Sequence, residues 1–328
     1  MWTKLSLVIG IAASVTATAV ADEIPLFASD TVVEMTLDAV QRDLKRAKKE
    51  EDPIPGTLTV STDTGVQAFD VKLTVRGKFR LENCRYPPIW VNFKKSKLDD
   101  TLFAGQNRLK LVTHCNKGER YDRLLLKEYL VYKMLNLMTP KSYRVRLARV
   151  TYLDAGKTDQ TQYAFFIEHT RTLAPRTGLD RLKVEKIRGS ELAFLDATRV
   201  ELFAYMIGHT DWAGTQGPPD GDCCHNAHLY VPAGVTVAKN TIVPVPYDFD
   251  ITGFVNPPYA EINQDLGIRN VRRRLYRGLC RAPTLLDQVV AEFVAKRSEL
   301  MALVEDFELL NEKERSKVAV YLTGFFNT

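Results

Sequence analysis

The chain has 328 residues, a formal net charge of +5 and an apolar content of 45%. This length allows one large domain or two lobes that share a cleft, and the apolar content is sufficient for a buried core. The net charge is small and the basic residues are scattered along the chain, which argues against a nucleic-acid-binding protein.

The N-terminus has the pattern of a secretory signal peptide. Lys4 gives a short positive region, an apolar run covers residues 5–15, and Ala19 and Ala21 are small residues at the cleavage positions. The run is too short and too rich in threonine for a stable transmembrane anchor. We therefore predict a signal peptide at residues 1–21 and a periplasmic or secreted protein, with an uncleaved anchor as the alternative.

The first half of the chain predicts a small antiparallel sheet. β-Branched and aromatic runs separated by turn residues are typical of short strands. A charged helix is expected at residues 37–51 and an amphipathic helix at 124–138. Strands are predicted at 31–37, 57–61, 69–76, 89–93, 109–112, 145–153 and 163–168, with the last two paired across 154–161.

The second half is mainly helical. Helices are predicted at 191–207, 283–303 and 311–325, with Asn311 as the N-cap of the last one, and short strands at 229–231 and 242–246. We place a boundary near residues 170–176. The expected units are therefore a β-rich lobe at 22–170 and a helical lobe at 171–328 that carries the catalytic-type loop.

Five cysteines follow the predicted leader. In an oxidising compartment they are expected to pair. Cys84 and Cys115 flank neighbouring strands, which predicts a disulfide between them. Cys280 is then expected to pair with Cys223 or Cys224, because adjacent cysteines rarely bond each other.

The most informative stretch runs from residue 208 to residue 253. It contains Asp211 in GHTDW, Asn226 in a His-Asn pair, and Asp248 and Asp250 in YDFD. In a phosphotransfer site an aspartate orients or deprotonates a hydroxyl, while a second aspartate and an asparagine hold the magnesium that bridges nucleotide phosphates. The same residue types also cap helices, close turns and bind structural calcium. Between Asp211 and Asn226 the chain carries an insertion rich in Gly, Pro and Asp.

The order of these segments resembles the CotH (spore coat H) kinase-like family, an atypical branch of the protein-kinase fold, and also the loop of HipA-like kinases. The matching segments are VRGKFR at 75–80, RLKLV at 108–112, RLLLKEYLVYKML at 123–135, YAFFIEHT at 163–170, the TDW turn, the HN pair and YDFD. The resemblance implies an α+β, bilobal, protein-kinase-like fold, with an antiparallel-sheet small lobe and a mainly helical large lobe.

By this resemblance Asp211 is the catalytic residue, and Asn226, Asp248 and Asp250 are metal ligands. His209 and His225 are given no role, and Tyr247 and Phe249 are expected to pack on the face opposite the two aspartates.

Lys110, Glu128 and Arg76 are expected to bind the nucleotide. Lys110 lies mid-strand and is expected to form an ion pair with Glu128 on the following helix, as in kinases; exposure on an edge strand is the alternative. Arg76, beside Gly77, is expected to approach phosphate or to pair with a loop carboxylate. Glu168 would lie near the connector that binds the base.

The expected function is that of an exported phosphotransferase. It would use Mg or Mn with ATP or another nucleotide, and its acceptor is an unknown protein or small molecule with a hydroxyl group. Because a periplasm holds almost no nucleoside triphosphate, the alternative is a secreted pseudo-kinase, a binding or assembly module with a structural cation. A zinc site or zinc hydrolase is a third possibility, but it lacks the usual C-x-x-C spacing; its ligands would come from Cys223, Cys224, His225 and His228.

Overall fold

The computed structural model describes residues 24–47, 53–62, 65–77, 79–94, 98–217 and 221–328. The predicted signal peptide and its cleavage site lie outside the described residues. Within these ranges, no helix combines the length and the apolar character needed to span a bilayer.

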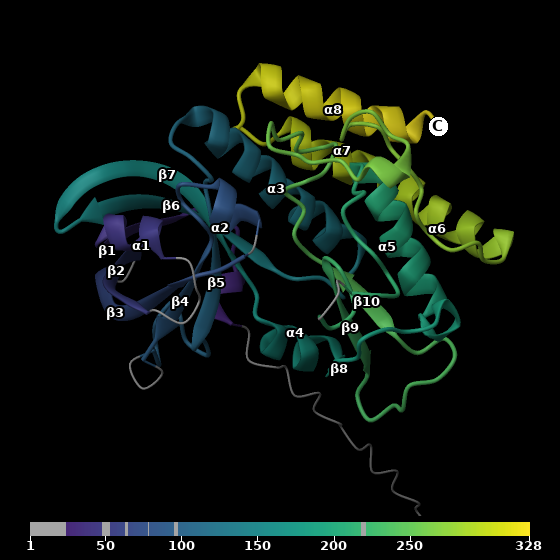
Figure 1. Ribbon diagram of the computed structural model, residues 1–328, viewed down its shortest axis with the longest axis horizontal. Helices are drawn as coiled ribbons and strands as arrows, with labels where there is room; N and C mark the ends of the chain where they lie inside the picture. The colour runs from purple at the N-terminus through teal and green to yellow at the C-terminus, as the bar shows by residue number, and fades with distance from the viewer. Residues whose placement is uncertain (1–23, 48–52, 63–64, 78, 95–97, 218–220) are drawn as a thin grey trace, which may run out of the picture.

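Seven strands of the first half close into a barrel (Figure 1). Their order is β1-β2-β3-β4-β5-β7-β6, and every neighbouring pair is antiparallel except β1 and β6, which run parallel and close the ring. Closure leaves no open sheet edge. The strands are β1 (Val33–Ala39), β2 (Ile54–Thr62), β3 (Gly65–Val75), β4 (Ile89–Phe93), β5 (Arg108–Thr113), β6 (Val145–Asp154) and β7 (Lys157–Ile167).

The prediction of a bilobal protein-kinase-like fold with an antiparallel-sheet small lobe is therefore wrong. The parallel pairing that closes the barrel joins Val33 to Ala148, which are far apart in the sequence. Alternating apolar residues predict a strand but not its neighbours, so this pairing left no local signal. The predicted pairing of the strands at 145–153 and 163–168 is confirmed, but the connection between them is shorter than predicted, because a tight turn at Ala155 and Gly156 joins β6 directly to β7.

The second half combines helices with a small sheet of order β10-β9-β8. The predicted helix at 283–303 is divided at Lys296, and the helix predicted at 37–51 is much shorter. The helices are α1 (Gln41–Arg46), α2 (Phe79–Asn83), α3 (Glu119–Met138), α4 (Thr170–Thr177), α5 (Phe194–Ile207), α6 (Pro283–Ala295), α7 (Arg297–Glu305) and α8 (Glu312–Phe326), with 3-10 turns at Pro25–Phe27, Gly189–Glu191 and Gln264–Leu266. The strands of the small sheet are β8 (Leu179–Leu182), β9 (Ala227–Pro232) and β10 (Val243–Pro246).

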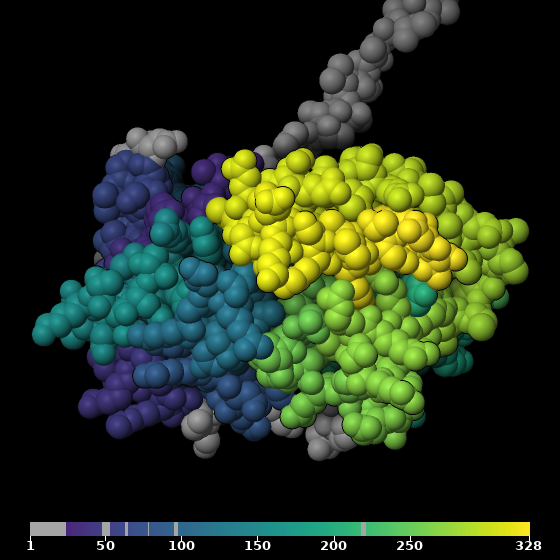
Figure 2. All heavy atoms as spheres, turned by 90° about the horizontal axis from the view of Figure 1, so that it is seen from above, coloured from purple at the N-terminus to yellow at the C-terminus, as the bar shows by residue number. Residues whose placement is uncertain are grey.

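Two large apolar clusters hold these parts together. One fills the barrel and includes Leu58, Val91 and Phe166. The other surrounds α3, which is buried along most of its length between the barrel and the C-terminal helices. α3 packs against α7, which packs against α8, and Figure 2 shows the C-terminal residues, in yellow, on the face above them. Since α3 contacts both halves, it fixes the barrel relative to the loops that follow α5 and β10.

The cysteines pair in part as predicted. The disulfide between Cys84 and Cys115 is confirmed. The prediction that Cys280 pairs with Cys223 or Cys224 is wrong, because these two cysteines pair with each other and Cys280 is free and exposed. Cys223 and Cys224 are buried in an apolar cluster with Ala227, Leu229 and Val231 of β9.

Candidate functional site

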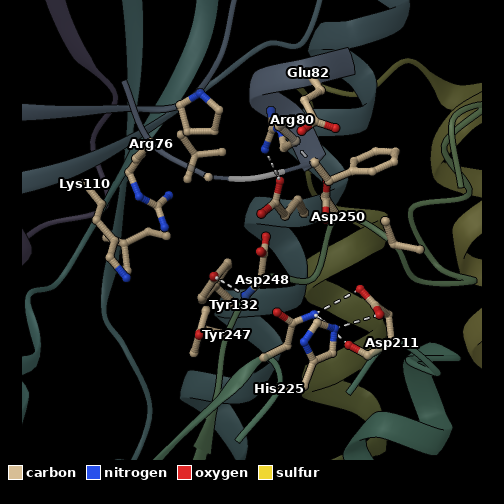
Figure 3. A pocket seen from close by; sticks show the side chains of 18 residues that line it. Arg76, Arg80, Glu82, Lys110, Tyr132, Asp211, His225, Tyr247, Asp248 and Asp250 are labelled. Atoms are coloured by element: carbon tan, nitrogen blue, oxygen red, sulfur yellow. Dashed lines mark hydrogen bonds and ion pairs between the residues drawn. The ribbon is translucent and has the colours of Figure 1, made fainter. Parts of the chain in front are cut away.

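A cavity of about 410 Å³ lies where the barrel meets the loops after α5 and β10 (Figure 3). All seven residues that the phosphotransfer hypothesis made catalytic, phosphate-binding or magnesium-binding line this cavity. These residues are Arg76, Lys110, Glu128, Asp211, Asn226, Asp248 and Asp250.

Asp211 and Asn226 are held together at one end of the cavity, although an insertion separates them in the sequence. The Asn226 side-chain amide donates to the Asp211 main-chain carbonyl at 2.6 Å and to its Oδ2 at 3.0 Å. These bonds use the amide nitrogen of Asn226 and leave its side-chain oxygen as an acceptor.

His225 was given no role by the sequence, yet its Nε2 lies 2.9 Å from Asp211 Oδ1. This hydrogen bond raises the pKa of His225. Although burial opposes it, the same bond lowers the pKa of Asp211. His225 therefore belongs to the site. In the sequence, its position next to Asn226 is the feature that could have indicated this.

Asp248 and Asn226 share an unusual backbone conformation, with φ of +62° and +53°. Asn and Asp tolerate this left-handed region better than most other residues, so part of their role is to shape the loops. The Asp248 amide donates to the hydroxyl of Tyr132 on α3 at 2.9 Å. The Asp248 carboxylate makes no hydrogen bond or ion pair with another described residue, so it is available to a ligand.

Glu128 pairs with Arg80, and the predicted pair with Lys110 is wrong. Arg80 Nη1 lies 3.6 Å from Glu128 Oε2, and its Nε lies 3.9 Å from Asp250 Oδ2. Its third contact is a hydrogen bond to the Thr113 carbonyl. Arg80 was missed because it lies on α2, a five-residue helix that the sequence did not predict.

The Arg80 guanidinium is the counter-charge of two buried carboxylates. Glu128 and Asp250 are 3% and 6% exposed. Burial raises the pKa of Glu128, although Arg80 opposes this shift. The pKa of Asp250 is raised to about 7, mainly by burial and in addition by the negative charge of the neighbouring Asp248. Asp250 is thus committed to Arg80, which leaves Asp248 as the better metal ligand of the two.

Lys110 lies on β5 between β4 and β7, so the alternative of an exposed edge strand is wrong. It faces Trp90 across the β4–β5 pair, and its Nζ lies 5.5 Å from the centre of the Trp90 ring and 5.1 Å from that of Tyr247. The Arg76 guanidinium lies 5.4 Å from the Trp90 ring. Cation–π contacts of this kind attract a cation to the face of an aromatic ring.

Figure 3 shows the resulting arrangement, with Arg76 and Lys110 on one side of the cavity and Asp248 and Asp211 on the other. Tyr247 lines the cavity between these two groups, so the prediction that it packs away from the aspartates is wrong. Phe249 does pack in the core, against Tyr132.

Glu168 does not line the cavity. It is 1% exposed and forms an ion pair with Arg176 at 2.7 Å. This carboxylate therefore ties the last turn of α4 to the end of β7 and does not contact a ligand in the cavity.

The residues present fit magnesium or manganese better than zinc. Among the described residues, no group of three or more His, Cys, Asp and Glu side chains is arranged to hold a metal ion. The zinc alternative fails in addition because Cys223 and Cys224 form a disulfide and His228 Nδ1 bonds to the Tyr143 hydroxyl. Magnesium is commonly held by one or two carboxylates together with substrate phosphates, and the oxygens of Asp248 and Asn226 supply such a donor set.

A scan of the chain against protein-family models finds no match, and a search of the curated proteins finds no significant match. The resemblance to the CotH family therefore stays a prediction, and the function has to be inferred from the cavity itself.

Proposed function

We propose that the protein transfers a phosphoryl group from a nucleotide to a hydroxyl acceptor, with magnesium or manganese as cofactor. The observation that supports this best is the pairing of opposite charges across one cavity. Arg76 and Lys110 present positive charge from the barrel, and Asp248 and Asn226 present oxygen ligands from the facing loops. A metal–phosphate complex needs both kinds of group.

Each side chain then has a defined task. Arg76 and Lys110 bind phosphate oxygens, and the Lys110 ammonium is steered toward them by the rings of Trp90 and Tyr247. Asp211 orients the acceptor hydroxyl and accepts its proton, with its carboxylate direction fixed by His225 and Asn226. Asp248 and Asn226 would hold the metal, which would supply positive charge to offset the negative charge of the transferred phosphoryl group.

We propose that the protein acts outside the cytoplasm. The disulfide between Cys84 and Cys115 favours an oxidising compartment, as does the predicted leader. Since such compartments contain little nucleoside triphosphate, the donor has to be tested and not assumed.

A thermal-shift titration with ATP, GTP and ADP, each with Mg²⁺, with Mn²⁺ or with EDTA, tests the proposal. For the wild type we expect a rise in melting temperature that requires both metal and nucleotide, because a ligand that binds only the folded state stabilises it. Asp248→Asn keeps the size of the side chain but removes the charge that holds the metal. It should lose this rise while its own melting temperature stays close to that of the wild type.

The matched control is Asp287→Asn, which removes an exposed carboxylate from α6, away from the cavity. It should behave as the wild type does. If metal alone stabilises the wild type and no nucleotide adds to the effect, the binding module with a structural cation is the correct function. A wild type that responds to no nucleotide–metal pair would rule out phosphotransfer.

A further inference from the structure

The loop that carries Asp211 is held from behind by a residue outside the cavity. Thr210, Asp211 and Trp212 follow α5 and are part of no helix or strand. Nη1 of Arg277 donates to the carbonyl of Trp212 at 2.6 Å and to the carbonyl of Thr210. One nitrogen therefore holds the carbonyls of the two residues that flank Asp211 in the chain.

This arrangement limits how the Asp211 main chain can move. A shift of the main chain at Asp211 that carries the carbonyl of Thr210 or Trp212 with it has to break a hydrogen bond to Arg277. The Trp212 ring is 5% exposed and packs against Val200 and Ala204 of α5, which anchors the far side of the loop. The loop is therefore held by hydrogen bonds from Arg277 and by the apolar packing of Trp212.

The charge of Arg277 is also placed to act on Asp211. Burial lowers the pKa of Arg277, and the nearby Asp211 carboxylate partly offsets this effect. Asp211 is therefore attracted to the guanidinium behind it while Asn226 and His225 hold its oxygens in front.

We infer that Arg277 is a positioning residue for Asp211, an inference that rests on the proposed function. It touches neither the cavity nor a bound ligand, and it acts by fixing the direction from which Asp211 meets the acceptor hydroxyl. Phosphoryl transfer depends mainly on such positioning, so a small displacement of Asp211 is expected to slow the reaction strongly.

The chain offers a closely matched control. Arg274, three residues earlier, also donates to two main-chain carbonyls, that of Met206 at 3.0 Å and that of Tyr321. Its role is of the same structural kind, but neither carbonyl belongs to the Asp211 loop. A general loss of stability should therefore appear equally in Arg277→Met and Arg274→Met.

The experiment compares wild type, Arg277→Met, Arg277→Lys and Arg274→Met. Hydrogen exchange of the segment from Thr210 to Ala213 reports the position of the loop, and steady-state kinetics with the metal–nucleotide pair that stabilises the wild type report its consequence. For Arg277→Met we expect faster exchange in this segment and a kcat lowered roughly 10- to 100-fold, with the KM for nucleotide within about twofold of wild type. The ammonium of Arg277→Lys can still donate to a carbonyl, so this variant should recover part of kcat.

Arg274→Met should leave both exchange in this segment and kcat unchanged once the fraction of folded protein is taken into account. If wild type turns over and Arg277→Met has the kcat of Arg274→Met, the inference about Arg277 is wrong and the proposed function stands. If Arg277→Met lowers kcat without altering exchange in the loop, a displaced Asp211 is not the cause of the slower reaction, and the inference about Arg277 is again wrong. A wild type without turnover overturns the proposed function and this inference together.

Discussion

At the scale of single residues, the buried part of the site depends on the Arg80 guanidinium. We expect Arg80→Met to lower the free energy of unfolding by about 3–5 kcal/mol, because Glu128 and Asp250 would be left buried without a counter-charge. Urea denaturation measures this change. Adding Glu128→Gln to Arg80→Met should restore part of the loss, since a neutral amide needs no cation.

The control for this variant is Arg273→Met, which removes an exposed arginine and should change stability by no more than about 0.5 kcal/mol. If Arg80→Met and Arg273→Met were equally stable, the proposed network of buried charges would be incorrect.

The sequence predicted the members of the site better than their partners. The resemblance to kinases selected Lys110 and Glu128, and the carboxylates of the YDFD segment selected Asp248; all three line one cavity. The pairing of Glu128 was wrong because a contact depends on distances that a single sequence does not encode. Arg80 had the charge required to replace Lys110, but it lies on a helix too short to leave a periodic pattern.

At the scale of elements, an ion pair joins α3 to α8. Lys127 Nζ lies 2.6 Å from Glu314 Oε2, and Glu314 also accepts from Lys317 on its own helix. Although burial opposes it, the hydrogen bonds from the two lysines lower the pKa of Glu314 to about 2. The pKa of Lys127 is lowered, because the effect of burial is larger than the opposing effect of the hydrogen bond to Glu314.

This pair predicts a pH dependence of stability. In the unfolded chain Glu314 titrates near its ordinary pKa of about 4.3, so its contribution to stability is complete above that value. The contribution should be lost as the pH falls from about 4.3 through about 2, because the folded state then has to take up the proton. Glu314→Gln should therefore be less stable than wild type at pH 7, and the difference should shrink toward pH 2.

Urea denaturation of both proteins between pH 7 and pH 2 measures this dependence. The control is Glu312→Gln, an exposed carboxylate two residues before Glu314 in the first turn of α8. A constant difference between Glu314→Gln and wild type across the whole range would show that the ion pair does not stabilise the contact between α3 and α8.

Elements with a strong local pattern were predicted within a few residues. β4 has a clear apolar alternation, α3 and α8 are long, and the N-cap of α8 was identified from Asn311, whose side chain accepts from the Glu314 amide. α2, α4 and β8 were missed. α2 and α4 bury one residue each, so they contain no apolar repeat.

At the scale of the whole molecule, the closed barrel was beyond reach of the sequence, because its closing pair β1–β6 joins distant segments. The pairing of Cys84 with Cys115 was within reach because both flank strands that are neighbours along the chain. This disulfide also joins α2, which carries Arg80, to the end of β5, whose Thr113 accepts a hydrogen bond from Arg80. Global stability and the geometry of the site are therefore coupled.

Non-reducing peptide mapping should link Cys84 to Cys115 and find Cys223 and Cys224 oxidised within one peptide, with Cys280 alkylated without reductant. Replacing Cys84 and Cys115 together by Ala should lower the free energy of unfolding by about 3–4 kcal/mol, the chain-entropy value for a loop of this size. Replacing Cys280 by Ala is the control and should have little effect. A mapped bond between Cys280 and another cysteine would contradict the pairing.

The central claim is that one cavity holds a metal–nucleotide complex between the barrel and the facing loops. A crystal structure of the protein with Mn²⁺ and a non-hydrolysable ATP analogue, with anomalous scattering used to locate manganese, tests it most directly. We expect manganese in contact with the side-chain oxygens of Asp248 and Asn226, and the phosphates directed toward Arg76 and Lys110. Manganese bound elsewhere, or a cavity without nucleotide at saturating concentration, would contradict the account.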